Sequence, residues 1–180
     1  MAIDGDIKFS AFPGSSDTTR SRERTLVRAL NYRVERPSEP SHGSRLTGFR
    51  AHKPFKVTCD IDRAAPEIFS RLTTGKKIDE VEVRLWRPDA DGAERAYMTF
   101  VLSNVRVVGV EFIQLHNLQS NALELATPAM VEYEFVFADI EVEYDDGRGA
   151  VVASDSWLKR GLRRMAGMRR RRKERGANPE

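Results

Sequence analysis

Apolar and polar residues alternate along the middle of the chain. Val81, Val83 and Leu85 stand between charged residues, and this period of two places one side of a β-strand against a core and the other in water. Turn-forming residues follow at 88–92, and a second alternating stretch occupies 97–102. Because a short loop joins the two stretches, we expect them to form a β-hairpin.

Further stretches have the length and composition of strands. The others that we predict are Ile7–Phe12, Leu26–Arg36, Phe55–Asp60, Val105–Ile113, Val131–Phe137 and Ile140–Tyr144. Val105–Ile113 is apolar on both faces around Gly109, which predicts a strand that is covered on two sides or bent at the glycine. Turn residues occupy 145–147, so we expect the strand pattern to be complete by Asp146.

One segment before the last 24 residues has the pattern of a helix. Pro66 suits the first turn, Ile68, Phe69 and Leu72 are spaced to form an apolar stripe, and Gly75 suits the left-handed position at the end. Many short strands with a single helix predict a mainly β fold. We expect a compact β-barrel of antiparallel strands, with one short helix that plugs an end.

Two segments lack a strand pattern. Residues 37–53 contain prolines, glycines and serines, which predicts a long loop, and a loop of this length inside a compact domain is usually functional. After Trp157, the residues Leu158, Leu162 and Met165 stand at helical spacing among arginines. This pattern predicts a basic C-terminal extension that is either a short amphipathic helix or disordered.

The charge is distributed unevenly. In total, 30 Lys and Arg against 27 Asp and Glu give a formal net charge of +3. Ten of these bases and two of the acids lie from residue 157 onward, so this segment carries +8 and the first 156 residues carry −5. Binding to nucleic acid or to an anionic membrane would therefore depend on the last 24 residues. The other interpretation of the same charges is a solvated extension that aids solubility.

Length and composition exclude several classes of protein. The 180 residues suffice for one globular domain, and 40% hydrophobic residues exclude general disorder. No run approaches the ~20 apolar residues of a spanning helix, so we do not expect an integral membrane protein. The first residues include two acids where a signal peptide has basic and apolar regions. We therefore expect synthesis in the cytoplasm without a signal peptide.

The motifs of common enzymes are missing from the sequence. The segment 75–77 lacks the first glycine and the hydroxyl residue of a phosphate-binding loop. The turn at 89–92 is followed by Phe100 at the position where a calcium loop needs glutamate. We therefore predict that the protein is not an enzyme and holds no cofactor.

Metal binding and cysteine chemistry are also unsupported. His42, His52 and His116 lack the spacing of a zinc site, and we expect them to be solvated loop residues. Cys59 is the single cysteine, so it forms no intramolecular disulfide. Its place in an alternating strand predicts a buried thiol rather than a nucleophile.

Seven stretches along residues 1–157 match one family in order. They are Met1–Phe9, Leu30–Pro37, Phe49–Phe55, Asp60–Lys76, Val81–Asp91, Tyr97–Glu111 and Phe137–Trp157. With these residues the chain resembles the hemolysin-coregulated protein (Hcp) family, which provides the inner-tube subunit of type VI secretion systems. We expect two parts, an Hcp-like β-barrel domain at 1–157 and a basic tail at 158–180.

The resemblance implies a structural function. In this family hexameric rings stack into a tube, a spike (VgrG-like) protein caps the tube, a contractile sheath surrounds it, and the lumen carries small effector cargo. The resemblance also implies a protein that resides in the bacterial cytoplasm before firing and is then secreted to the extracellular space or a target cell. The alternative is a nucleic-acid- or anionic-membrane-binding protein that acts through its basic tail.

The resemblance also indicates candidate residues in the lumen. Asn31 matches the family position that contacts cargo, and strand alternation places Arg33 and Glu35 on the same face. Alternation alone is equally compatible with a polar residue on an outer wall. Arg28 and Arg33 also depart from the family, which commonly has small or neutral residues in this strand.

The loop 37–53 is the candidate for contacts between subunits. Its length and its lack of an apolar pattern give it little reason to become ordered alone. We expect it to reach a neighbouring subunit or the next ring, with Leu46 and Phe49 as apolar anchors and Arg45 and Arg50 paired with acidic groups.

The start of the helix is a second departure from the family. Ala64 and Ala65 precede Pro66, where Ser or Thr is common. An N-cap would then have to come from Asp62, and its absence would cost roughly 1 kcal/mol.

Overall fold

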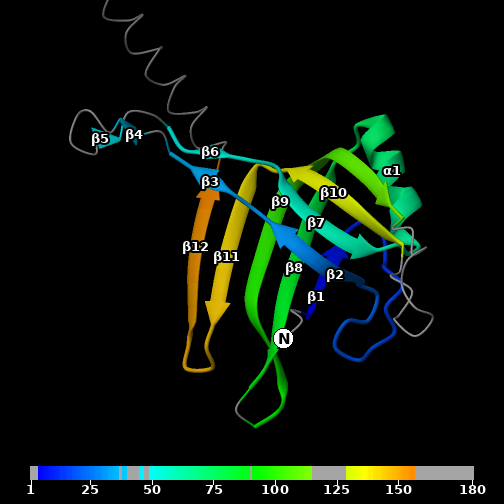
Figure 1. Ribbon diagram of the computed structural model, residues 1–180, viewed down its shortest axis with the longest axis horizontal. Coiled ribbons are helices and arrows are strands. Elements are labelled where there is room, and N and C mark those ends of the chain that lie inside the picture. Colours follow the sequence, from blue (N-terminus) through cyan, green and yellow to red (C-terminus); the bar gives the residue numbers. More distant parts are fainter. Residues whose placement is uncertain are drawn as a thin grey trace, which may run out of the picture.

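The computed structural model describes residues 4–36, 38–39, 45–46, 49–89, 91–114 and 129–156. In these ranges the chain forms twelve strands and one helix (Figure 1). In chain order they are β1 (Asp4–Phe9), β2 (Thr25–Asn31), β3 (Val34–Glu35), β4 (Ser38–Glu39), β5 (Arg45–Leu46), β6 (Ala51–His52), β7 (Phe55–Asp60), α1 (Ala64–Thr74), β8 (Ile78–Pro88), β9 (Glu94–Ile113), β10 (Met130–Val136), β11 (Asp139–Asp145) and β12 (Ala150–Ser156).

Six of the strands close into an antiparallel barrel, which confirms the predicted fold class. Their order is β10-β7-β2-β1-β8-β9, and pairing between β9 and β10 closes the ring of strands. Strands β11 and β12 continue the sheet from β9 and lie outside this closed barrel. Figure 1 shows the β11–β12 hairpin standing beside the barrel on its left.

Strand β9 belongs to both the barrel and the hairpin. We expected separate strands at 97–102 and 105–113, but the structure has one strand of 20 residues. Its first half pairs with β11 up to Ser103, and its second half pairs with β10 from Arg106 onward. Between the halves, Asn104 has a φ of 52°, a conformation that asparagine tolerates better than most residues. The chain can thus change partners without ending the strand.

A β-bulge follows at Val108. Glu134 of β10 pairs with Gly109, and the next residue, Phe135, pairs with Val107, so Val108 has no partner of its own. Val108 is exposed. The irregularity therefore lies beside the glycine, as the sequence suggested, but this part of the strand is not covered on both sides within the subunit.

Strand β12 was not predicted. We expected the strand pattern to be complete by Asp146, whereas β12 pairs with β11 along its whole length, from Asp145↔Ala150 to Asp139↔Ser156. Most residues of β12 are exposed on both faces. A strand that buries neither face has no alternating pattern, and this explains why it was not recognised.

The segment predicted as a long loop forms a narrow ribbon in its described part. Val34 and Glu35 of β3 pair with His52 and Ala51 of β6, and farther out β4 pairs with β5. We call the described residues between Val34 and His52 the arm. Figure 1 shows the arm leaving the barrel beside the end of β12. The predicted strand 26–36 accordingly ends at Asn31 in the barrel, and Val34 of the arm is exposed.

The helix α1 packs against β9 at one end of the barrel. It ends at Gly75, whose φ of 66° is left-handed as expected. The N-cap position is occupied by Arg63, which makes no capping hydrogen bond, but Asp62 beside it takes over this role because its Oδ1 accepts a hydrogen bond from the Ala64 amide at 2.9 Å. Ile68 faces the core as predicted, but Phe69 is 49% exposed, so the apolar stripe is narrower than the sequence indicated.

The core fills the barrel with alternate residues from all six strands. Its largest buried side chains are aromatic, and rings of Phe9, Tyr133 and Phe135 contact one another with centroids 6.1–6.5 Å apart. Burial of such rings supplies much of the hydrophobic stabilisation of a domain.

A charged residue is buried in the wall of the barrel. The side chain of Asp6 on β1 is 0% exposed. Its Oδ1 accepts hydrogen bonds from Arg24 Nη1 and Arg84 Nε, both at 3.0 Å. Its Oδ2 accepts hydrogen bonds from Ser21 Oγ and Trp86 Nε1, both at 2.7 Å. A single carboxylate therefore ties β1 to β8 and to the loop between β1 and β2.

We expect Asp6→Asn to lower the free energy of unfolding by about 3 kcal/mol, because it removes the charge that compensates Arg84 and leaves Arg24 with Glu82 as its acidic partner. Denaturant unfolding followed by circular dichroism measures this change. Asp79→Asn removes an exposed acid of β8 and is the matched control, with an expected effect within about 0.5 kcal/mol. Equal unfolding midpoints for the two variants would contradict the role of Asp6.

Candidate functional site

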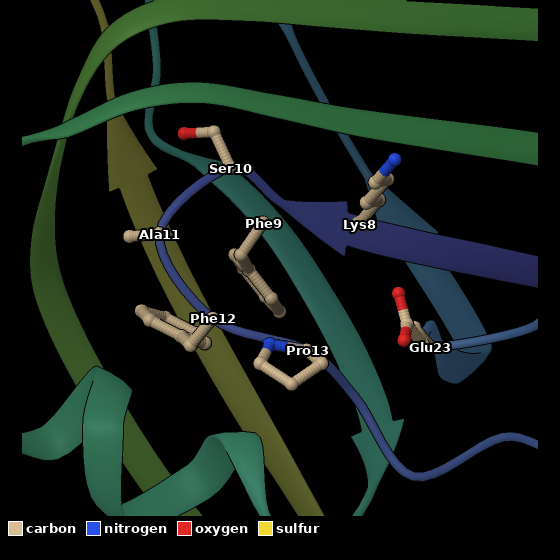
Figure 2. A pocket seen from close by; sticks show the side chains of 7 residues that line it. All are labelled: Lys8, Phe9, Ser10, Ala11, Phe12, Pro13 and Glu23. Atoms are coloured by element: carbon tan, nitrogen blue, oxygen red, sulfur yellow. The ribbon is translucent and has the colours of Figure 1, made fainter.

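A shallow depression lies where the chain bends after β1. Figure 2 shows its lining residues, and its volume is about 290 Å³. Phe9 and Phe12 stack with ring centroids 5.0 Å apart and belong to the core. Lys8 and Glu23 are the ionisable groups of the lining, and Ser10 Oγ accepts a hydrogen bond from the Glu80 amide. The depression brings no nucleophile together with a base, so its geometry does not support catalysis.

The thiol of Cys59 lies in the core, as predicted. The side chain is fully buried in β7, and this burial raises the pKa of the thiol well above its usual value. Because the thiolate is the reactive form, Cys59 is poorly suited to nucleophilic catalysis.

We expect the folded protein to react negligibly with a thiol reagent such as DTNB at pH 8, and to react with one equivalent once guanidinium unfolds it. Absorbance at the wavelength of the released thiolate measures both states. Since Cys59 is the single cysteine, the signal has one source. A rapid stoichiometric reaction without denaturant would contradict the buried assignment.

Within the described ranges, no three His, Cys, Asp or Glu side chains are grouped so that they could hold a metal ion. The same part of the chain contains no helix that is long and apolar enough to cross a bilayer.

Asn31 lies on the outer face of the barrel wall. Across the sheet it is opposite Lys56 of β7, and Lys56 is opposite Glu134 of β10, which pairs with Gly109 of β9. We call the outer side of these four strands the Asn31 face. Asn31 is exposed, as expected for a residue that meets a solvent-filled space or a partner.

The Asn31 face carries more acidic than basic groups near its centre. Lys56 Nζ contacts Glu134 Oε1 and lies 3.4 Å from Glu132 Oε1. The hydrogen bond to Glu134 raises the pKa of Lys56. Glu111 pairs with Glu132 on the next strand. One lysine thus faces three glutamates, so the centre of the face has a local charge of −2.

Gly109 gives Glu134 the space to lie across the sheet. A Cβ at Gly109 would come within 3.0 Å of Glu134 Cγ, closer than side-chain carbons normally approach. At the edge of the same face, Arg28 Nε and Nη2 donate hydrogen bonds of 2.7 and 2.6 Å to the two oxygens of Asp60. The arginine that departs from the family is therefore paired within the subunit.

The three predicted lumen residues are not in one place. Asn31 is in the barrel wall, whereas Arg33 follows the end of β2 and Glu35 lies in β3 of the arm. Glu35 contacts Lys53 and Arg33, each at 2.9 Å. The hydrogen bond from Lys53 is the main reason why the pKa of Glu35 is lowered. Arg33 and Glu35 thus help to join the two strands at the base of the arm.

The predicted contact residues all belong to the arm. Arg45 and Leu46 form β5, and Phe49 is 79% exposed. Arg50 pairs within its own subunit, because its Nε and Nη2 contact the two carboxylate oxygens of Asp155 on β12. This ion pair lies within one subunit, and a contact of Arg50 with a neighbouring subunit or ring stays a prediction.

His52 is not the solvated histidine that we expected. Its side chain is 7% exposed, and its Nε2 lies 3.0 Å from Asp155 Oδ2. Its Nδ1 contacts the hydroxyl of Tyr32, and its ring meets Phe137 edge-on at 5.7 Å between centroids. Nothing in the sequence indicates this cluster, because Asp155 is 103 positions from His52 and lies in the strand that was not recognised.

A family model described as "Type VI secretion system effector, Hcp" matches residues 1–144. The "Major exported protein" of Pseudomonas aeruginosa is 33% identical over 97 residues, which cover 54% of this chain and 55% of that protein. The aligned part thus spans about half the length of this curated relative.

Solved structures resemble the fold over most of the chain. A variant of the Hcp1 protein from E. coli EAEC 042 is 25% identical and covers 87% of this chain and 99% of that chain, with a TM-score of 0.70. Hcp1 from Salmonella typhimurium is 18% identical and covers 88% and 97%, with a TM-score of 0.69. At the lower identity the likeness concerns the fold alone. Since the family model matches four fifths of the sequence, the chain belongs to the Hcp family of type VI secretion proteins.

Proposed function

We propose that this chain is the tube subunit of a type VI secretion system and acts by assembly rather than by catalysis. In this proposal six copies form a ring, and rings stack into the inner tube that is expelled. Family membership supports the proposal, as does the name "Major exported protein" of the Pseudomonas aeruginosa relative. The protein would reside in the bacterial cytoplasm before firing and would then be secreted.

The observation that carries the assembly proposal is the β11–β12 hairpin outside the closed barrel. Val142 of β11 packs against the core, and Tyr144, two residues on, lies on the same side of the sheet. Tyr144 pairs with Val151 of β12, which is 70% exposed. The core side of the sheet therefore continues beyond the barrel as an uncovered apolar surface. A second copy that covers it by a head-to-tail contact would generate a closed ring.

The free edge of β12 supports the same proposal. This strand is the last in the sheet order, so its outer edge faces no other described strand. Unpaired amides and carbonyls at a sheet edge offer hydrogen bonds to another chain. An apolar surface next to a free edge is well suited to contact a neighbouring subunit.

For the lumen we propose the Asn31 face. It is polar, bears the exposed Asn31 beside the Lys56–Glu134 pair, and has a local excess of acidic groups. In a hexamer these charges would be repeated six times around the channel. Effector cargo with basic groups would then be favoured over acidic cargo.

The arm is the proposed contact to a neighbouring subunit or ring. Phe49 of the arm is 79% exposed, and Arg45 and Leu46 lie in β5. Aromatic side chains and arginines provide most of the binding energy in many interfaces. A spike (VgrG-like) protein and a contractile sheath would complete the assembly.

We expect purified protein to form six-fold rings of about 122 kDa, six times the 20.4 kDa of one chain, with Asn31 on the wall of the central channel. Light scattering gives the mass, and electron microscopy of the rings places the Asn31 face.

Two outcomes would contradict this prediction. A species of 20 kDa across micromolar concentrations would contradict ring formation. Rings with Asn31 on their outside would contradict the lumen assignment but not ring formation. A variant with Val151→Asp should lower the fraction of rings, and Asp146→Asn, in the turn of the same hairpin, should not.

For the segment 158–180 we propose binding to an acidic surface, independent of ring formation. A chain that ends at Leu158 should form rings like the full chain but lose a salt-sensitive interaction with an acidic protein surface, nucleic acid or anionic lipid. The comparisons give no support to the alternative in which nucleic-acid or membrane binding is the main function.

Light scattering of the shortened chain tests the first half of this prediction, and co-sedimentation at 50 and 300 mM salt with anionic vesicles or DNA tests the second. Failure of the shortened chain to form rings would show that the tail is structural. Unchanged binding after truncation would show that residues before 158 make the salt-sensitive interaction.

A further inference from the structure

Two peripheral parts of the subunit meet at Asp155. The arm leaves the barrel after β2, and the β11–β12 hairpin leaves it after β10 (Figure 1). Neither part is enclosed by the closed barrel. Arg50 and His52 lie at the base of the arm, and Asp155 lies near the end of β12. A single carboxylate thus joins residues of the arm to the last strand of the hairpin.

Asp155 is directed toward the base of the arm by the register of its strand. It pairs with Ile140 of β11, whose side chain is buried in the core. Residues opposite each other on antiparallel strands point to the same side, so Asp155 is directed to the core side of the hairpin. At this position its carboxylate is partly shielded from water, which strengthens its contacts with Arg50 and His52.

Two side chains of the arm, Arg50 and His52, bind the carboxylate oxygens of Asp155. Arg50 binds both carboxylate oxygens in a fork, and His52 Nε2 donates to Oδ2 at 3.0 Å. A forked arginine–carboxylate contact fixes direction as well as distance. It therefore restricts the rotation of the arm more than a single surface ion pair would.

A chain of hydrogen bonds extends the cluster into the core. The Tyr32 hydroxyl donates to His52 Nδ1, which leaves Nε2–H to donate to Asp155. Burial raises the pKa of Tyr32 to about 12, so the hydroxyl keeps its proton. The ring of Tyr32 also packs against Phe55 with centroids 5.1 Å apart. Asp155, His52 and Tyr32 thus link the arm to the barrel core.

We propose that Asp155 is a positioning residue that sets the direction of the arm, through Arg50 and His52, for its contact with the neighbouring copy of this chain. This inference rests on the proposed role of the arm in assembly. Without the carboxylate, the arm would keep its strand pairing but would sample many directions. Assembly would then have to fix the direction of the arm, which costs conformational entropy. In the wild-type chain the contacts of Asp155 fix this direction before the subunits meet.

The test compares Asp155→Asn with Glu141→Gln in the full-length chain. Glu141 is an exposed acid of β11 opposite Ser154, so its replacement removes the same charge from the same hairpin. Hydrogen exchange measured by mass spectrometry follows peptides from the arm and from the residues that flank it, including the Lys53 amide that donates to the Arg33 carbonyl at 3.0 Å. Peptides from β8 report on the barrel.

We expect arm amides of Asp155→Asn to exchange about tenfold faster at equal oligomeric state, because charge-assisted hydrogen bonds are lost. Exchange in β8 should stay unchanged, and tube or ring formation should need a higher protein concentration. Glu141→Gln should match the wild type. Unchanged arm exchange in Asp155→Asn would overturn the proposal. Faster exchange in β8 as well would also overturn it, since Asp155 would then support the barrel as a whole.

A double-mutant cycle tests whether Asp155 acts through Arg50. If it does, Arg50→Gln combined with Asp155→Asn should accelerate arm exchange less than the two single effects combined. Independent effects would overturn the proposed route. Arm exchange is measured within one subunit and does not require rings. A wild-type chain that forms no rings would therefore refute the proposed function. The exchange of these variants would still decide whether Asp155 orients the arm.

Discussion

The buried carboxylate of Asp6 is the constraint on which the barrel wall depends. Its two oxygens accept hydrogen bonds from arginine, serine and tryptophan donors that belong to β8 and to the loop before β2. Arg24, which also contacts Glu82 at 2.6 Å, extends the network along β8. An apolar residue in this place would pack with any neighbour of suitable size, whereas a buried carboxylate tolerates one arrangement of donors. The first strand of the chain is thereby held in a single register between β2 and β8.

Large apolar side chains are exposed on elements that lie outside the closed barrel. The arm, the β11–β12 hairpin and the exposed face of α1 with Phe69 all lie outside the closed ring of strands. A subunit that must associate with copies of itself needs apolar groups that it does not cover alone. The apolar side chains exposed on these elements, among them Phe49, Phe69 and Val151, agree with the proposed assembly.

Strands in which buried and exposed residues alternate could be predicted from the sequence. Contacts between residues far apart in the sequence could not. The alternation in 55–60 and 131–136 matches β7 and β10 closely, because each strand buries one face. Strand β12 buries neither face and has no such signal. The family resemblance predicted Asn31 as a lumen residue. Its position beside Lys56 follows from the strand register, which the sequence alone does not give. His52 and Asp155 were missed because their contact joins residues 103 positions apart, and neither belongs to a recognisable motif.

The long separation between Arg50 and Asp155 has a consequence for synthesis. The two residues are 105 positions apart, and at about 5–20 residues per second the ribosome needs roughly 5–20 s to make the intervening chain. During this time the barrel strands up to β10 emerge, but the arm lacks the carboxylate that orients it. A nascent chain is thus unable to present an oriented arm to finished copies until β12 has emerged. The order of residues along the chain itself delays association until the subunit is nearly complete.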